Sequence, residues 1–173
     1  PVGFKNGTAG DVQVAVDAVG AAAHPHHFLS LTKAGHSAIF ETRGNADCHI
    51  ILRGGRQPNY HREAVQDAAE MLQRAGLPQR IMIDCSHANS RKMASRQAIV
   101  AGDVAHQVAD GDQRIMGIMV EGHLVEGRQS RELGKPLAYG QSITDACLGW
   151  DDTAVLVERF AEAAVRRRQR RAA

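Results

Sequence analysis

The sequence predicts an α/β fold in which short, apolar, parallel strands alternate with longer amphipathic helices. Two observations lead to this prediction. Short apolar runs, such as residues 81–84 and 115–121, are each flanked by segments with helical periodicity, which is typical of βα units. These runs also end in charged or polar side chains, at the edge where a parallel sheet gathers its binding loops. With 173 residues, 43% of them hydrophobic, the chain can form one domain with a substantial core.

The first third of the chain predicts a strand, a helix and a hairpin. Residues 2–5 form a short strand, and Asp11 can cap a helix that runs to about Ala23. Its inward residues are Val12, Val14, Ala15, Ala18 and Val19. The segment His24-Pro25-His26-His27 is interpreted as a helix exit, since Pro25 disrupts the spacing that a histidine metal site would need. Residues 28–42 predict an antiparallel hairpin insert that turns at Lys33-Ala34-Gly35.

The middle of the chain predicts two further βα units. Residues 49–53 form a strand that ends in Arg53-Gly54-Gly55, and these glycines would let a ligand approach the backbone. A helix over residues 61–75 follows Asn59. The strand 81–84 leads into the polar segment Asp84-Cys85-Ser86-His87-Ala88-Asn89. For this segment alone, a satisfied core histidine and a capping aspartate remain an alternative to an active site.

The last third predicts a helix over residues 92–109, a strand over 115–121 and a long loop over 122–140. A polar segment around Asp145 follows, and Asp151, Asp152 or Thr153 caps the last helix. The basic tail, residues 166–173, contains five arginines, and without them the net charge of +2 becomes negative. We interpret this tail as a solvated helix end, with binding of nucleic acid or an anionic membrane as the alternative.

Composition excludes several classes of protein. The aromatic content of 4% argues against a stacking platform for nucleic acid. Cys48, Cys85 and Cys147 are odd in number and form no CxxC pair, which argues against a disulfide scaffold and fits a cytoplasmic location. No apolar run approaches 18 residues, so no membrane span is predicted.

The residues at the strand ends predict a metal and anion site. Four predicted parallel strands end in Lys5, Arg53, His87 and Glu121. Together with Asp145, the last two offer nitrogen and oxygen donors that suit Mn²⁺, Fe²⁺ or Zn²⁺. The lysine and the arginine suit phosphate or carboxylate, which indicates an anionic substrate and Lewis-acid or bound-water chemistry. The alternative is a structural ion pair between Lys5 and Glu121.

Five motifs resemble one known family. They are Pro1-Val2-Gly3-Phe4-Lys5-Asn6-Gly7-Thr8, His49-Ile50-Ile51-Leu52-Arg53-Gly54-Gly55, Asp84-Cys85-Ser86-His87-Ala88-Asn89, Glu121-Gly122-His123-Leu124-Val125-Glu126-Gly127 and Tyr139-Gly140-Gln141-Ser142-Ile143-Thr144-Asp145-Ala146-Cys147. In this order they resemble type I 3-deoxy-D-arabino-heptulosonate 7-phosphate (DAHP) synthase. The resemblance implies a TIM (β/α)8 barrel. It also implies condensation of phosphoenolpyruvate with erythrose 4-phosphate to give DAHP and phosphate, the first step of the shikimate pathway to aromatic amino acids.

The resemblance assigns roles to individual residues. It makes His87, Glu121 and Asp145 ligands of a divalent metal such as Mn²⁺ or Fe²⁺. Lys5, Arg53 and His87 would bind phosphoenolpyruvate, and Lys5 and His87 would also be catalytic. Asp84 and Asn89 would contact these residues without touching the substrate. Phe28, Ser30 and Phe40 would lie in a pocket for an aromatic amino acid inhibitor. Alternatively, the two phenylalanines pack the hairpin onto the barrel.

The resemblance covers the C-terminal half of the family's single barrel domain, about the last four of eight βα units plus the hairpin. A cysteine metal ligand, a Lys-Pro-Arg-Thr segment and two substrate arginines of the family would precede Pro1. We therefore expect the isolated chain to be inactive or nearly so. The resemblance also implies that the full-length form is a homo-oligomer. The alternative function is an inactive half-barrel that acts only as a ligand-binding or assembly module.

Overall fold

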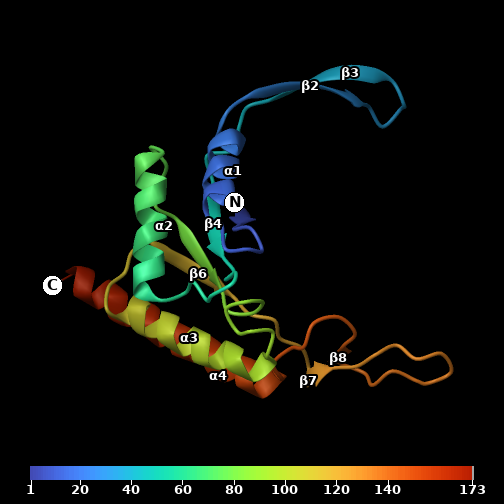
Figure 1. Cartoon of the computed structure of the whole chain (residues 1–173), viewed down its shortest axis with the longest axis vertical. Helices are drawn as coiled ribbons and strands as arrows, with labels where there is room; N and C mark the ends of the chain where they lie inside the picture. The colour runs from blue at the N-terminus through green and yellow to red at the C-terminus, as the bar shows by residue number, and fades with distance from the viewer. Residues whose placement is uncertain (173) are drawn as a thin grey trace.

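The computed structural model describes residues 1–172 and contains a parallel sheet whose four strands lie in the order β1-β4-β5-β6 (Figure 1). These strands are Val2–Lys5, Cys48–Leu52, Ile81–Asp84 and Ile115–Met119. The helices are α1 (Gln13–Ala23), α2 (Arg62–Arg74), α3 (Ala94–Ala109) and α4 (Trp150–Ala172). The predicted α/β fold with parallel strands is therefore confirmed, while residue 173 of the basic tail lies outside the described residues.

The sheet is held in register by its apolar residues. Ile50 of β4 pairs with Ile81 of β5, which in turn pairs with Ile115 of β6, and all three side chains are buried. Burying such a side chain stabilises the fold by about 2 kcal/mol. Each crossover joins neighbouring parallel strands in the same direction, so right-handed connections place the helices on one face of the sheet.

Helices α3 and α4 pack side by side along this layer (Figure 1). The arginine-rich end of α4 is partly anchored there rather than simply solvated. Arg167 donates two hydrogen bonds from Nη1, to the carbonyl oxygens of Asp112 (3.0 Å) and Ile115 (2.7 Å). Arg170 lies 3.8 Å from Asp110. The helix end thus clamps the turn that leads into β6.

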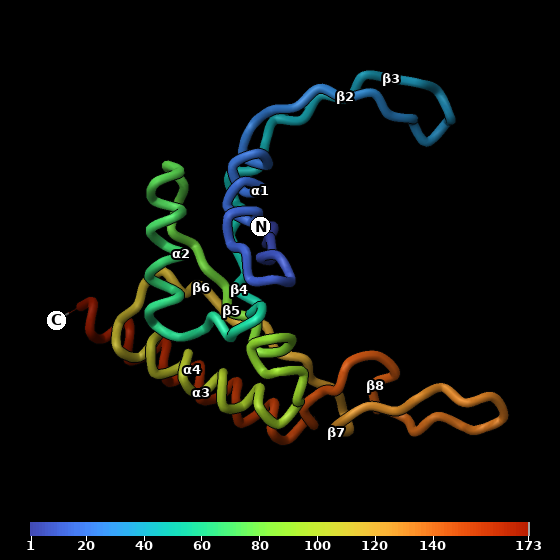
Figure 2. The backbone as a smooth tube through the Cα atoms, in the orientation of Figure 1, coloured from blue at the N-terminus to red at the C-terminus, as the bar shows by residue number. Residues whose placement is uncertain are grey.

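The hairpin formed by β2 (His26–Leu31) and β3 (Ser37–Thr42) extends away from the sheet (Figure 2). It confirms the predicted antiparallel insert, although the first strand begins two residues earlier than expected. Phe28 and Phe40 stack on each other with ring centroids 5.9 Å apart. Both rings are partly exposed, and within the described residues they do not pack against the four-stranded sheet.

Several boundaries differ from the sequence predictions. Helix α3 begins at Ala94 rather than at residue 92, because Arg91 and Lys92 adopt left-handed backbone angles, with φ of 54° and 58°. The predicted loop 122–140 contains strand β7 (Val125–Arg128), which pairs in parallel with β8 (Gln141–Ser142).

The ends and inner faces of two helices also differ from expectation. Asp151 and Asp152 lie inside the first turn of α4, where their charges favour the positive helix terminus, instead of capping it. In α1, Val16 takes the inward position, whereas Val14 is half exposed. Within residues 1–172, no helix is both long and apolar enough to cross a bilayer.

Candidate functional site

Three asparagine side chains, of which Asn6 and Asn89 are buried, join the carboxyl ends of β1, β4 and β5. Asn6 donates from Nδ2 to the carbonyl oxygen of Gly54 (3.0 Å) and accepts from the backbone N–H of Arg53 (2.8 Å). Asn59 accepts from the N–H of Gly54, and its own N–H donates to Oδ1 of Asn89 (2.8 Å). Asn89 donates to the carbonyl oxygens of Leu52 and Asp84. This asparagine network fixes three strand ends relative to one another.

The glycines after Arg53 allow neighbouring loops to pack closely, a role that the sequence analysis did not predict. Gly54 has φ of 77°, and a Cβ atom there would lie 2.6 Å from the backbone nitrogen of Asn89. A Cβ atom on Gly55 would lie 2.3 Å from the Cα atom of Gly10. The loops after β1, β4 and β5 therefore contact one another directly through their backbones.

Asp84 connects the lysine and the histidine of the predicted site. Its carboxylate is fully buried, and Oδ2 accepts a hydrogen bond from Nζ of Lys5 at 2.9 Å. The same oxygen lies 2.8 Å from Nδ1 of His87, an ion-pair distance without hydrogen-bond alignment. Lys5 therefore pairs with Asp84, so the alternative of a Lys5–Glu121 pair is wrong. The contact orients His87 so that Nε2 faces the opposite side, as in many histidine metal ligands.

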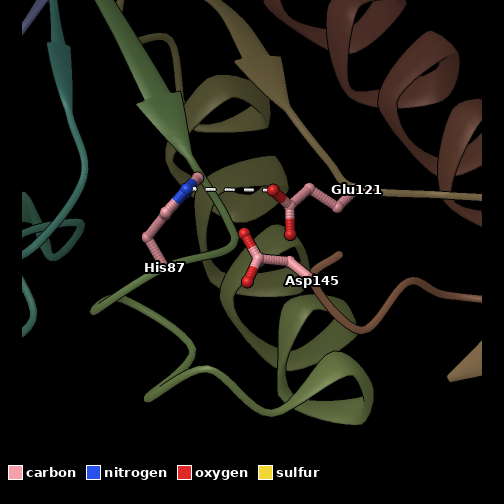
Figure 3. Close-up of side chains that lie close together, drawn as sticks. All are labelled: His87, Glu121 and Asp145. Carbon is pink, nitrogen blue, oxygen red and sulfur yellow. Dashed lines mark ion pairs between the residues drawn. The ribbon is translucent and has the colours of Figure 1, made fainter. Parts of the chain in front are cut away.

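His87, Glu121 and Asp145 converge beyond this nitrogen (Figure 3). One donor atom from each lies within 4.8 Å of the others, and Nε2 of His87 is 3.8 Å from Oε1 of Glu121. Metal–ligand bonds of about 2.0–2.2 Å allow two ligands of one ion to lie up to about 4.4 Å apart. The donor set thus fits one divalent cation after a small contraction.

Glu121 is held by two side chains that the sequence analysis missed. Ser86 donates a hydrogen bond of 2.7 Å from Oγ to Oε2 of Glu121. Gln97 on α3 accepts from the backbone N–H of Glu121 at 2.8 Å and donates to its carbonyl oxygen at 3.1 Å. Ser86 stands next to His87 in the sequence, which is a signal for its role. Gln97 lies 24 residues from its partner and gives no such signal.

The three donors face a cavity of about 560 Å³ with a cationic wall. Arg53, Lys92 and Arg128 line it together with Ser86 and the metal-donor side chains. Within residues 1–172, Nε of Arg53 is buried without a hydrogen-bond partner, which leaves a donor for an incoming anion. The sequence analysis predicted Arg53 but missed Lys92 and Arg128. Phe28, Ser30 and Phe40 lie on the projecting hairpin instead of at this cavity (Figure 2).

Two cysteines near the site have raised pKa values. Burial, and secondarily the charge of Asp84, raises the pKa of Cys85 to about 12. Burial also raises the pKa of Cys147, with the charges of Glu121 and Asp145 adding to this effect and a hydrogen bond with Ser142 opposing it. The side chains that converge on the cavity, His87, Glu121 and Asp145, offer nitrogen and oxygen donors.

Comparisons with known proteins agree on one family. A sequence model of the DAHP synthetase I family matches residues 1–158. The Phe-sensitive phospho-2-dehydro-3-deoxyheptonate aldolase of Escherichia coli is 59% identical over 168 residues, which is 97% of this chain and 48% of that protein. The tyrosine-inhibited aldolase of Schizosaccharomyces pombe is 52% identical over 98% of this chain and 47% of its own length.

A solved structure gives the same result. Phospho-2-dehydro-3-deoxyheptonate aldolase from Francisella tularensis superposes with a TM-score of 0.89 and 49% sequence identity, over 95% of this chain and 48% of that one. The chain therefore spans about half the length of the relatives that it matches. The family model matches most of the chain, and about half or more of the aligned residues are identical in the relatives. The chain therefore belongs to the DAHP synthetase I family.

Proposed function

We propose that this chain forms part of a DAHP synthase, which condenses phosphoenolpyruvate with erythrose 4-phosphate and releases phosphate. The observation that carries the proposal is the convergence of His87, Glu121 and Asp145 on a cavity with a cationic wall. Both substrates are anions, and both carry a phosphate group. The names of the relatives as phospho-2-dehydro-3-deoxyheptonate aldolases support the same reaction.

The cations of the site would bind and orient phosphoenolpyruvate. The planar guanidinium of Arg53 suits bidentate binding of phosphate or carboxylate, and its Nε is a free buried donor within the described residues. Lys5 is partly exposed beside the buried Asp84, so its ammonium is fixed in place yet reachable. Lys92 and Arg128 add positive charge to the cavity wall. Preorganised charges of this kind lower the free energy of a transition state that gains negative charge.

His87, Glu121 and Asp145 would hold a divalent cation such as Mn²⁺ or Fe²⁺, for which a nitrogen and two carboxylates are suitable donors. Such an ion supplies Lewis-acid polarisation of an aldehyde or of a water. Asp84 would keep the His87 ring in the orientation that leaves Nε2 free. Asn89 would hold the main chain of Asp84 from behind.

We further propose that the four-stranded sheet is a portion of a TIM barrel, corresponding to about its last four βα units, in a cytoplasmic homo-oligomer. Parallel strands with polar side chains at their carboxyl ends support this architecture. Relatives are named Phe-sensitive, tyrosine-inhibited and Trp-sensitive. By analogy, an aromatic amino acid would bind near Phe28, Ser30 and Phe40 of the hairpin and inhibit the enzyme.

A chimera tests the proposed reaction. The matched 168-residue segment of the Escherichia coli relative is replaced by this chain, and formation of DAHP from the two substrates is measured with Mn²⁺ present. We expect turnover, and we expect Glu121→Gln to reduce it by about 100-fold or more, because a metal ligand is lost. Glu126→Gln, which changes an exposed carboxylate in the same segment, is the matched control.

Two results would contradict the proposal. A folded chimera without turnover would favour the ligand-binding or assembly role for this chain. Equal turnover in the Glu121→Gln and Glu126→Gln chimeras would remove Glu121 from the metal site.

A further inference from the structure

Gln97 is the one fully buried glutamine side chain on α3 that contacts a predicted metal ligand, among the residues that the structure describes. Both ends of its amide face the backbone of Glu121. Oε1 accepts from the Glu121 N–H at 2.8 Å, and Nε2 donates to the Glu121 carbonyl oxygen at 3.1 Å. This pair of hydrogen bonds fixes the orientation of one peptide segment from two sides.

The position of Glu121 explains why such a contact is needed. β6 ends at Met119, so the ladder with β5 does not extend to Glu121, and its backbone N–H and carbonyl oxygen need other hydrogen-bond partners. The amide of Gln97 supplies partners for both groups. Because a glutamine side chain rooted on a helix offers one donor and one acceptor at fixed spacing, it sets the direction in which the Glu121 side chain leaves the backbone.

The same carbonyl oxygen also connects to the segment of the third ligand. The backbone N–H of Leu148 donates to the Glu121 oxygen at 2.9 Å, so this oxygen accepts from Leu148 and Gln97 together. Leu148 is itself buried, and it follows Asp145 by three residues. Gln97 therefore contacts the junction between the two chain segments that carry Glu121 and Asp145.

We propose that Gln97 is a positioning residue that sets the spacing between Glu121 and Asp145 and thereby the metal affinity of the site. The inference rests on the proposed metal role of His87, Glu121 and Asp145. Ser86 restrains the carboxylate of Glu121 through Oε2, but only Gln97 restrains its main chain through a side chain in the described residues. Without the amide, the peptide at Glu121 can rotate, and the donor atoms leave the arrangement that fits one ion.

Gln107 provides a matched control on the same helix. It is also buried, and Nε2 donates to the carbonyl oxygen of Tyr60 at 2.9 Å and to Asp103 at 2.7 Å. Ten residues along α3 separate the two glutamines, about 15 Å at the rise of an α-helix. Methionine has a volume similar to that of glutamine but lacks the amide, so both substitutions remove buried hydrogen bonds. Only Gln97→Met removes a contact with a predicted metal ligand.

The test uses the chimera described above, in which this chain replaces the matched segment of the Escherichia coli relative; the chimera without further substitutions is the parent. Mn²⁺ binding is measured by electron paramagnetic resonance of the free ion, in parallel with thermal unfolding without metal. We expect Gln97→Met to weaken Mn²⁺ binding by about tenfold or more, whereas Gln107→Met stays within about twofold of the parent. Both variants should unfold at somewhat lower temperature than the parent.

The outcomes separate the two proposals. If the parent binds Mn²⁺ and the two variants bind it equally well, the role of Gln97 is refuted while the metal site stands. If the parent itself does not bind Mn²⁺, the metal site and the inference built on it both fail. A loss of affinity that is equal in both variants would mean that general destabilisation, and not positioning, weakens binding.

Discussion

The two ends of the parallel sheet are stabilised by different chemistry. At the carboxyl end, the amides of Asn6, Asn59 and Asn89 connect three loops through neutral hydrogen bonds. Ion pairs instead hold the turns that lead into β4, β5 and β6, either within these turns or to residues of α2 and α4. They are Asp112–Arg114 (2.7 Å), Arg62–Asp110 (2.9 Å), Asp47–Arg80 (3.4 Å) and Arg170–Asp110 (3.8 Å).

The difference between the two ends shows how a fold can remain stable while many charged side chains lie at one site. At the carboxyl end, apart from the Lys5–Asp84 pair, uncharged amides connect the loops, so that other charged side chains can face the cavity and bind anions or a cation. At the amino end, charged side chains pair with each other. This division agrees with the general pattern that binding loops gather at the carboxyl ends of parallel strands.

The largest expected effect comes from breaking the asparagine network. Asn89→Ala removes a fully buried amide and leaves the carbonyl oxygens of Leu52 and Asp84 and the N–H of Asn59 without these partners. We expect the free energy of unfolding to fall by about 3 kcal/mol in urea titrations, nearly equally at pH 5 and pH 8. Asn45→Ala, which removes one hydrogen bond at Asp47, should cost about 1 kcal/mol or less. Equal losses in the two variants would refute the special role of the network.

A smaller, pH-dependent effect is expected at the amino end. Burial of Asp112 would raise the pKa of its carboxyl group, but the hydrogen bonds and charge of Arg114 outweigh this and lower it below the usual value of 3.8. A pKa that is lower in the folded state stabilises the fold above pH 4, and this contribution disappears as the pH falls through the folded-state pKa. Asp112→Asn should therefore cost about 1.5 kcal/mol at pH 7 and progressively less below pH 4. A cost that does not change between pH 7 and pH 3, measured by urea unfolding, would contradict this account.

The smallest effect is expected in the hairpin, which belongs to neither end. Leu29 and Ile39 are cross-strand partners, and their exposed fractions are 79% and 73%. Leu29→Ser should change the free energy of unfolding of this chain by less than about 0.5 kcal/mol, since little area is buried. Leu52→Ala, a buried counterpart in β4, should cost about 3 kcal/mol. If the two substitutions had similar costs in the same urea titration, the hairpin would be packed in solution.

The sequence was sufficient for the strands and for the residues at their ends. Apolar runs that stop at Lys5, Arg53 and Asp84 predicted where the sheet would present polar groups, since parallel strands share one carboxyl edge. The partners of these groups could not be read in the same way. Lys5 pairs with Asp84 across 79 residues, and no local pattern distinguishes this partner from Glu121.

Other features were missed for related reasons. Strand β7 is short and largely exposed, and it exists because β8 pairs with it, so periodicity alone does not predict it. Asparagine is common in turns, so the presence of Asn6 and Asn59 in loops can be explained by turns alone and does not indicate a network. Only the approach of three loops in space shows that their amides meet.

The backbone contacts at Gly54 and Gly55 have a consequence for how this site can vary during evolution. A methyl group at either position would overlap the main chain of a different loop, at Asn89 or at Gly10, so no flexible side chain can yield. Single substitutions at these glycines should therefore not be tolerated. The loops after β1, β4 and β5 can change in sequence only when compensating changes occur in one another. The three loops should therefore evolve together, although they are separated by long stretches of sequence.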